Sequence, residues 1–152
     1  MSNHGKIFIP DHEYKERVTR AAKILQREKL DAMIVNSNEA DYANARYFSG
    51  FWPLFERSGV AISASGDAAL MVGPESREFA ADRSRLEKIF VLKEYRESAD
   101  PAYPELKADT YQDVFHAIGV NGKKLRIGVA SYLVTSVIIM EGIKAAFPEA
   151  EI

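Results

Sequence analysis

The chain has 152 residues, of which 47% are hydrophobic and 28% are charged. This is an ordinary globular mixture, and the length suits one domain with a sizeable core. The net charge of −2 gives no basic excess to neutralise phosphates, so the composition argues against nucleic-acid binding. The sequence contains no cysteine, which excludes disulfides, thiolate catalysis and cysteine-ligated metal centres.

The apolar runs of the sequence are too short for targeting or membrane segments. The run 7–9 ends at Pro10 and is too brief for the core of a signal peptide. The longest apolar run, 132–140, is interrupted by Thr135 and Ser136 and falls far short of the roughly 20 residues that a bilayer crossing needs. We therefore expect a cytoplasmic protein with neither a membrane nor a nucleic acid among its partners.

Helical and strand-like patterns alternate along the chain. Tyr14, Val18 and Leu25 recur at helical spacing, with charged residues on the opposite face. The run 32–35 is apolar throughout, which indicates a central strand covered on both sides. By these criteria the sequence predicts helices at about 13–29, 39–48, 76–86, 110–118 and 135–147, and strands at 32–35, 60–63, 68–72, 89–92 and 125–129.

Turn and cap signals connect these elements into one fold. Gly66 and Asp67 lie in a short link between two strands and predict a β-hairpin, while Asp109 and Gln112 have the spacing of a capping box. Strands that alternate with helices imply a mostly parallel sheet with helices on both faces. The sequence thus predicts a single domain over 1–152, with 1–10 loose. The fold class is a three-layer α/β sandwich with a mixed, mostly parallel sheet of five or six strands that includes one antiparallel hairpin.

The last residues resemble the entry into another strand. The final predicted helix stops at Pro148, and a polar turn then leads to Ile152. We expect either that this strand is lost or that the chain is a fragment of a longer protein.

A self-contained active site is not evident in the sequence. Asp113 and His116 offer at most two weak metal ligands on one helix face, and a histidine in such a place is more often a surface or core residue. The turn 119–123 lacks the glycine spacing of a P-loop, and the serines lie outside a GxSxG frame. We therefore expect no catalytic residue, metal ligand or cofactor on this chain.

One segment combines aromatic and arginine side chains in a loop-like stretch. Residues 44–57 read NARYFSGFWPLFER and include the only tryptophan of the chain. One interpretation is that Tyr47, Phe48 and Phe51 pack under the edge of the sheet. The other is that Trp52, Phe55 and Arg57 face a partner, because Trp, Tyr, Phe and Arg dominate the cores of interfaces. Arginine also has the planar fork that grips a carboxylate.

Motifs in a fixed order give the sequence a family resemblance. Residues 30–35 read LDAMIV, residues 44–51 read NARYFSGF, residues 57–62 read RSGVAI and residues 70–75 read LMVGPE. This ordered set resembles the N-terminal domain of the creatinase/prolidase family, and nearly the whole chain, from about Tyr14 to Ile152, fits it. The individual motifs are degenerate, so the specificity lies in their order.

The resemblance implies a function for the domain. In that family it precedes a catalytic domain that cleaves Xaa-Pro bonds or hydrolyses creatine. The catalytic domain of the peptidases holds two divalent metal ions (Mn, Co or Zn), and that of the creatinase type holds none. The chain would then be a noncatalytic N-terminal domain that serves dimerisation and closes the active site of the partner subunit. Its partners would be a second copy of the parent protein and its own C-terminal catalytic domain.

The resemblance also implies roles for particular residues. Trp52, Phe55 and Arg57 are the positions that could reach the substrate of the partner subunit, and Tyr47 and Phe51 are candidate interface residues. A different hypothesis stays open beside this one. In it the chain is a free-standing α/β module for protein interaction or small-ligand binding, with the aromatic segment as its contact surface.

Overall fold

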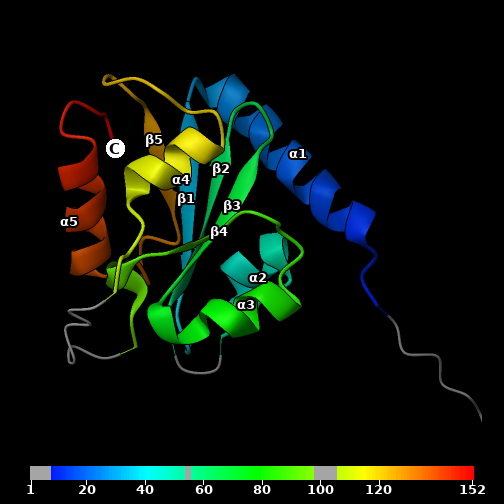
Figure 1. Ribbon diagram of the computed structural model, residues 1–152. Coiled ribbons are helices and arrows are strands. Elements are labelled where there is room, and N and C mark those ends of the chain that lie inside the picture. Colours follow the sequence, from blue (N-terminus) through cyan, green and yellow to red (C-terminus); the bar gives the residue numbers. More distant parts are fainter. Residues whose placement is uncertain (1–7, 54–55, 98–105) are drawn as a thin grey trace, which may run out of the picture.

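The computed structural model describes residues 8–53, 56–97 and 106–152, which form a central sheet with helices on both faces (Figure 1). The expected loose segment 1–10 lies largely outside the described residues. The elements are α1 (Asp11–Glu28), β1 (Ala32–Ser37), α2 (Ala43–Ser49), β2 (Ser58–Ser63), β3 (Ala68–Val72), the 3₁₀ turn η1 (Pro74–Ser76), α3 (Arg77–Arg83), β4 (Ile89–Val91), the 3₁₀ turn η2 (Lys93–Tyr95), α4 (Tyr111–Ala117), β5 (Ile127–Ala130) and α5 (Val137–Ala146).

The five strands lie in the order β4-β3-β2-β1-β5. β1 is parallel to β5, and β3 is parallel to β4, whereas β2 runs antiparallel to both of its neighbours. β2 alone therefore runs against the other strands, and the mixed, mostly parallel sheet is confirmed. The predicted hairpin is β2–β3; the antiparallel pairing of β1 with β2 is additional to it.

Four of the five strands end on the same side of the sheet. β1, β3, β4 and β5 all end at the same edge, and β2 begins there, because Ser37 pairs with Ser58 and Ser58 pairs with Val72. We call this end the carboxyl edge. In open α/β sheets it is the edge where ligands usually bind.

Apolar clusters on both faces of the sheet give the fold its three layers. α1, α2 and α3 cover one face and α4 and α5 cover the other, which confirms the α/β sandwich (Figure 1). On the first face the buried residues include Val18, Leu25, Ala45, Phe51, Val60, Ile62, Leu70 and Ala80. On the second face they include Ile34, Met71, Val114, Phe115, Ile118, Ile127, Ile139 and Ile143.

Local polar contacts explain where two helices begin. The second helix starts at Ala43 rather than near residue 39, because the Asn38 side chain accepts hydrogen bonds from the amides of Ala40 (3.0 Å) and Asp41 (2.8 Å) and holds them in a turn. The capping box of α4 also lies one residue later than the sequence predicts. It joins Thr110 to Asp113, whose carboxylate accepts from the Thr110 amide at 2.9 Å.

A single parallel bridge stands where the sequence predicts a further strand. The Ile127 amide donates to the Glu151 carbonyl, and the Glu151 amide donates to the Leu125 carbonyl, each at 2.8 Å. This bridge pairs Glu151 with Arg126 on the outer side of β5.

In the part of the chain that the structure describes, no helix is long and apolar enough to cross a membrane.

A buried polar chain ties the carboxyl edge to the second face. The Tyr95 hydroxyl donates to Asn36 Oδ1 at 2.8 Å, and Asn36 Nδ2 donates to Thr135 Oγ1 at 2.9 Å. Tyr95 and Asn36 are both fully buried, and burial raises the pKa of the Tyr95 hydroxyl well above its ordinary value of 10. This shift favours the neutral phenol, which is the form that donates the hydrogen bond to Asn36.

Replacing Tyr95 with phenylalanine is expected to destabilise the fold by about 1–3 kcal/mol, because Asn36 Oδ1 would lose its donor in a buried site. The free energy of unfolding in urea measures this loss. Tyr132→Phe is the matched control, since that ring is 74% exposed, and it should stay within about 0.5 kcal/mol of the parent. Equal effects of the two substitutions would contradict the assigned role of the buried chain.

Candidate functional site

The aromatic segment of the sequence connects α2 to β2 and lies at the carboxyl edge. α2 ends at Gly50, which has a φ of +68° and whose amide donates to the Arg46 carbonyl at 2.8 Å. This left-handed conformation favours glycine and turns the chain out of the helix. The segment then passes Phe51 and Trp52 and reaches Arg57 immediately before β2.

Trp52 belongs to a cluster of two rings and one guanidinium group. Its ring stacks on Tyr42, with centroids 4.5 Å apart and an interplanar angle of 15°. The Arg46 guanidinium lies 4.8 Å from the Trp52 ring and 5.9 Å from the Tyr42 ring. Trp52 is still 42% exposed, so the cluster supports the ring and leaves part of it accessible. We call Tyr42, Arg46 and Trp52 the aromatic–arginine cluster.

Arg57 lies at the start of β2 and is half-buried. Among the described residues it has no hydrogen bond or ion pair to another side chain, unlike the arginines of α1, which pair with glutamates. The neighbouring Ser58 hydroxyl is buried and also lacks a hydrogen-bond partner among these residues. The end of the sheet thus holds a positive charge that the described part of the chain does not neutralise.

The candidate substrate contacts therefore fall into three groups. Trp52 is exposed, Arg57 is half-buried, and Phe55 lies outside the described residues. The structure adds Tyr42 and Arg46, which sequence reasoning did not select. Their signal was present in the i, i+4 spacing, which places both side chains on one side of the first turn of α2.

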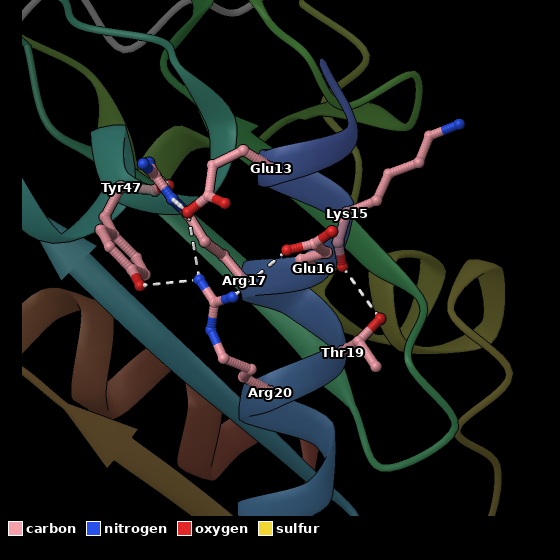
Figure 2. A network of polar contacts seen from close by, with 7 residues as sticks. All are labelled: Glu13, Lys15, Glu16, Arg17, Thr19, Arg20 and Tyr47. Carbon is pink, nitrogen blue, oxygen red and sulfur yellow. Dashed lines mark hydrogen bonds and ion pairs between the residues drawn. The ribbon is translucent and has the colours of Figure 1, made fainter. Parts of the chain in front are cut away.

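Tyr47, a candidate interface residue, is fixed by contacts with α1 (Figure 2). The Arg17 guanidinium lies 4.4 Å from the Tyr47 ring and donates to the Tyr47 carbonyl at 2.8 Å. Arg20 reaches the Tyr47 hydroxyl at 3.5 Å, and both arginines bind Glu13 Oε1, at 3.0 and 3.2 Å. The ring remains 45% exposed, so it presents an ordered surface beside the carboxyl edge.

Phe51, the other candidate interface residue, has no exposed surface. Its ring packs edge-on against Phe79 at 5.7 Å and forms part of the core under α1, α2 and α3. This agrees with the interpretation that Phe51 packs under the sheet. Because Phe51 is buried in the core, it anchors the segment that carries Trp52.

The Glu13 carboxylate is the charged centre of the contacts between α1 and Tyr47. Hydrogen bonds from Arg17 and Arg20 lower its pKa below the ordinary value of 4.5, against a smaller opposing effect of desolvation. Because its pKa is depressed on folding, Glu13 stabilises the fold above about pH 4.5. This stabilisation is lost as the pH falls through the pKa of the folded state.

Among the described residues, no group of three or more histidine, aspartate or glutamate side chains lies close enough to hold a metal ion. Asp113 is engaged in the capping box of α4, where hydrogen bonds from Thr110 lower its pKa. His116 Nδ1 lies 2.9 Å from Asn121 Oδ1 instead of turning toward Asp113. The two residues that the sequence offers as weak metal ligands are thus each bound to a different neighbour and do not face a common site.

A groove of about 370 Å³ lies between α1 and the β2–β3 turn and includes neither Trp52 nor Arg57 in its lining. Its charged residues include Lys88 and Asp67, which pair with each other at 2.8 Å. The groove is open to solvent, and two of its charged side chains neutralise each other. It therefore does not resemble the enclosed, mostly apolar pockets that hold small molecules. The carboxyl edge remains the stronger candidate site.

The geometry defines a class of protein: a mixed α/β sandwich that presents aromatic and arginine side chains at one sheet edge and has no metal cluster in its described part. The model of the creatinase/prolidase N-terminal domain matches residues 17–152. The chain therefore belongs to this family. No curated protein sequence matches the chain.

Solved structures with the same fold include parts of peptidases. Dipeptidase PepE from Mycobacterium ulcerans superimposes with a TM-score of 0.62 at 15% identity, over 95% of this chain and 35% of that one. The N-terminal domain of the cytoplasmic peptidase PepQ from Mycobacterium tuberculosis gives a TM-score of 0.58 at 18% identity, over 91% and 88%.

The prolidase from Pyrococcus horikoshii gives a TM-score of 0.58 at 19% identity, over 90% of this chain and 31% of that one. The chain thus spans about a third of the whole prolidase and dipeptidase chains that it matches. At these identities the likeness establishes the fold. The family model and the match to the N-terminal domain of PepQ agree in placing the chain among domains of this type.

The single tryptophan gives a direct test of the aromatic–arginine cluster. Arg46→Ala should loosen the stack, shift the Trp52 emission to longer wavelength and raise its quenching by acrylamide about twofold, because one cover of the ring is removed. Arg27→Ala, at the far end of α1, is the matched control and should leave both signals unchanged. Identical spectra for all three proteins would show that Arg46 does not order Trp52.

Glu13→Gln should weaken the acid dependence of stability. Since Glu13 stabilises the fold only while it is ionised, the parent protein should lose more thermal stability than the variant between pH 7 and about pH 3.5. Tm measured across this range makes the comparison. Glu16→Gln serves as the control, because Glu16 makes a longer contact of 3.6 Å with Arg20 and is 59% exposed. A steeper loss in Glu13→Gln would contradict the assignment.

Proposed function

We propose that the chain is the noncatalytic N-terminal domain of a hydrolase, either a metal-dependent Xaa-Pro peptidase or an enzyme of the creatinase type. In this proposal it contributes to dimerisation and closes the active site of the partner subunit. The observation that carries the proposal is the combination of family membership with two features of the carboxyl edge: an exposed Trp52, and an Arg57 that forms no ion pair with any described residue. The names of the solved peptidases that share the fold support the same parent activity.

The site itself supports a binding role. The Arg57 guanidinium is a planar donor that can hold both oxygens of a carboxylate, and a peptide, an amino acid and creatine all carry that group. Trp52, held in place by Tyr42 and Arg46, would supply an apolar face at the same end of the sheet. Contributed to the partner subunit, these side chains would orient the substrate and exclude water from it.

The chemistry of bond cleavage is placed outside this chain. The described residues do not fit the two divalent metal ions that the family resemblance implies for a peptidase, since they form no cluster of three or more ligands. We assign those ions to the catalytic domain of the parent; a creatinase-type parent would have none.

The proposed location is the cytoplasm, as the name of the structurally similar PepQ states for that protein.

The proposal is tested in the longer polypeptide that would carry this domain. Arg57→Ala should lower kcat/KM for its substrate about 10- to 100-fold, as expected when one charged hydrogen bond to the substrate is lost. Arg27→Ala, which removes an arginine far from the carboxyl edge, should leave kcat/KM unchanged. The chain alone should show no turnover of Xaa-Pro dipeptides or creatine when Mn²⁺, Co²⁺ or Zn²⁺ is supplied.

Two outcomes would count against this function. Unchanged KM and kcat in Arg57→Ala would remove the role in substrate binding. Turnover by the chain alone would show that it carries its own catalytic machinery.

A further inference from the structure

The turn between α4 and β5 contains the dipeptide Asn121-Gly122, which occurs once in the sequence. Asparagine is a chemically labile residue, and it loses its side-chain amide most readily before glycine, because glycine has no Cβ to shield its backbone nitrogen. Both residues are exposed and lie outside the helices and strands. The backbone at this dipeptide is therefore not held by a helix or by the sheet.

The backbone nitrogen of Gly122 is accessible as a nucleophile. Gly122 has a φ of +131°, a conformation that residues with a side chain rarely adopt, so the turn itself favours glycine at this position. Among the described residues, the Gly122 amide donates a hydrogen bond to no acceptor. It can therefore lose its proton and attack a neighbouring group without first breaking a hydrogen bond of the fold.

His116, in the last turn of α4, contacts the carbonyl end of the Asn121 side chain. Its Nδ1 lies 2.9 Å from Asn121 Oδ1. Because Oδ1 can only accept a hydrogen bond, Nδ1 carries the proton in this contact and donates it. The bond draws electron density away from Asn121 Cγ. It also stabilises the negative charge that develops on Oδ1 when a nucleophile adds to Cγ, as the donors of an oxyanion hole do.

We propose that Asn121 is a site of spontaneous deamidation and that the hydrogen bond from His116 promotes the reaction. The Gly122 nitrogen gives up its proton and forms a bond to Asn121 Cγ. The bond from Cγ to Nδ2 breaks, and ammonia leaves with that proton. Water then opens the cyclic succinimide: addition at Cγ gives aspartate, and addition at the backbone carbonyl gives isoaspartate, in which the chain continues through the former side chain.

The two products differ in what they do to the connection between α4 and β5. On one side of the turn the Val120 amide donates to the Phe115 carbonyl at 2.9 Å, and on the other the Leu125 carbonyl accepts from the Glu151 amide at 2.8 Å. Isoaspartate adds one backbone atom between these fixed points, so the contacts of Val120 and Leu125 with the second core must shift. Aspartate keeps the backbone length and an oxygen for His116. We therefore expect isoaspartate, and not aspartate, to lower the stability.

Deamidation is measured on the folded chain kept at neutral pH for several weeks. Trypsin releases residues 108–123, in which Asn121 is the only asparagine, and mass spectrometry of this peptide gives the rate of conversion. Asn36 is the control within the same chain, because it is fully buried and its amide is bonded at both ends, to Tyr95 and Thr135. Asn121 should convert at least about tenfold faster than Asn36, which reacts only when the structure opens.

Replacing His116 tests its part in the reaction. His116→Ala should slow the conversion of Asn121 about three- to tenfold, which corresponds to the loss of one hydrogen bond. His12→Ala is the matched control: His12 is an exposed histidine on α1, and its removal should leave the rate unchanged. Far-ultraviolet circular dichroism and Tm check that both variants are folded.

Labelling by an isoaspartyl methyltransferase measures the isoaspartate, and Asn121→Asp supplies the added charge without the added backbone atom. The isoaspartate form should have a lower Tm than Asn121→Asp, which should match the parent chain.

Three results would overturn the proposal in turn. An Asn121 that converts no faster than Asn36 would remove the site. A rate that stays the same or rises in His116→Ala would remove the part assigned to His116. Equal Tm values for the isoaspartate form and Asn121→Asp would remove the effect on the fold. The proposal does not depend on the function proposed above, which the Arg57→Ala kinetics test separately.

Discussion

The antiparallel pairing of β1 with β2 decides where the functional groups of this domain lie. Because Ser37 pairs with Ser58, the chain that leaves β1 must return to the same edge of the sheet before β2 begins. α2 and the aromatic segment are confined to that edge, and Trp52 and Arg57 lie with them. A parallel crossover to β2 would have delivered Arg57 to the opposite edge, away from the ends of β3, β4 and β5.

The aromatic segment is divided between anchoring and display. Phe51 is fully buried among the residues of the first core, whereas the next residue, Trp52, is 42% exposed. Tyr47 is fixed through Arg17 to α1, so the stretch that leads to Trp52 is attached to α1 at Tyr47 and to the core at Phe51. The exposed ring is thereby held in place, which would lower the entropic cost of the substrate contact that we propose for it.

Sequence patterns predicted the fold class and most elements, because apolar periodicity and turn residues act locally. The starts of α2 and α4 were misplaced for equally local reasons: Asn38 holds a turn, and the capping box uses Thr110 in place of Asp109. The β1–β2 pairing and the Tyr42–Trp52 stack depend on contacts between segments, which periodicity does not encode. The family resemblance found the correct family since it rests on the order of motifs along nearly the whole chain.

The distribution of charge partners separates the scaffold from the site. Asp31 accepts from the Arg126 amide at 2.7 Å, Asp109 accepts from the Val91 amide at 2.8 Å, and Glu13 binds two arginines. These carboxylates cap or join elements of the fold, so they are not available as a convergent group for proton transfer or metal binding. Arg57 stands in contrast, since no described carboxylate pairs with it. Acids that serve the fold, and an arginine that the described residues leave without an ion pair, fit the proposed role of a domain that holds a substrate for chemistry performed elsewhere.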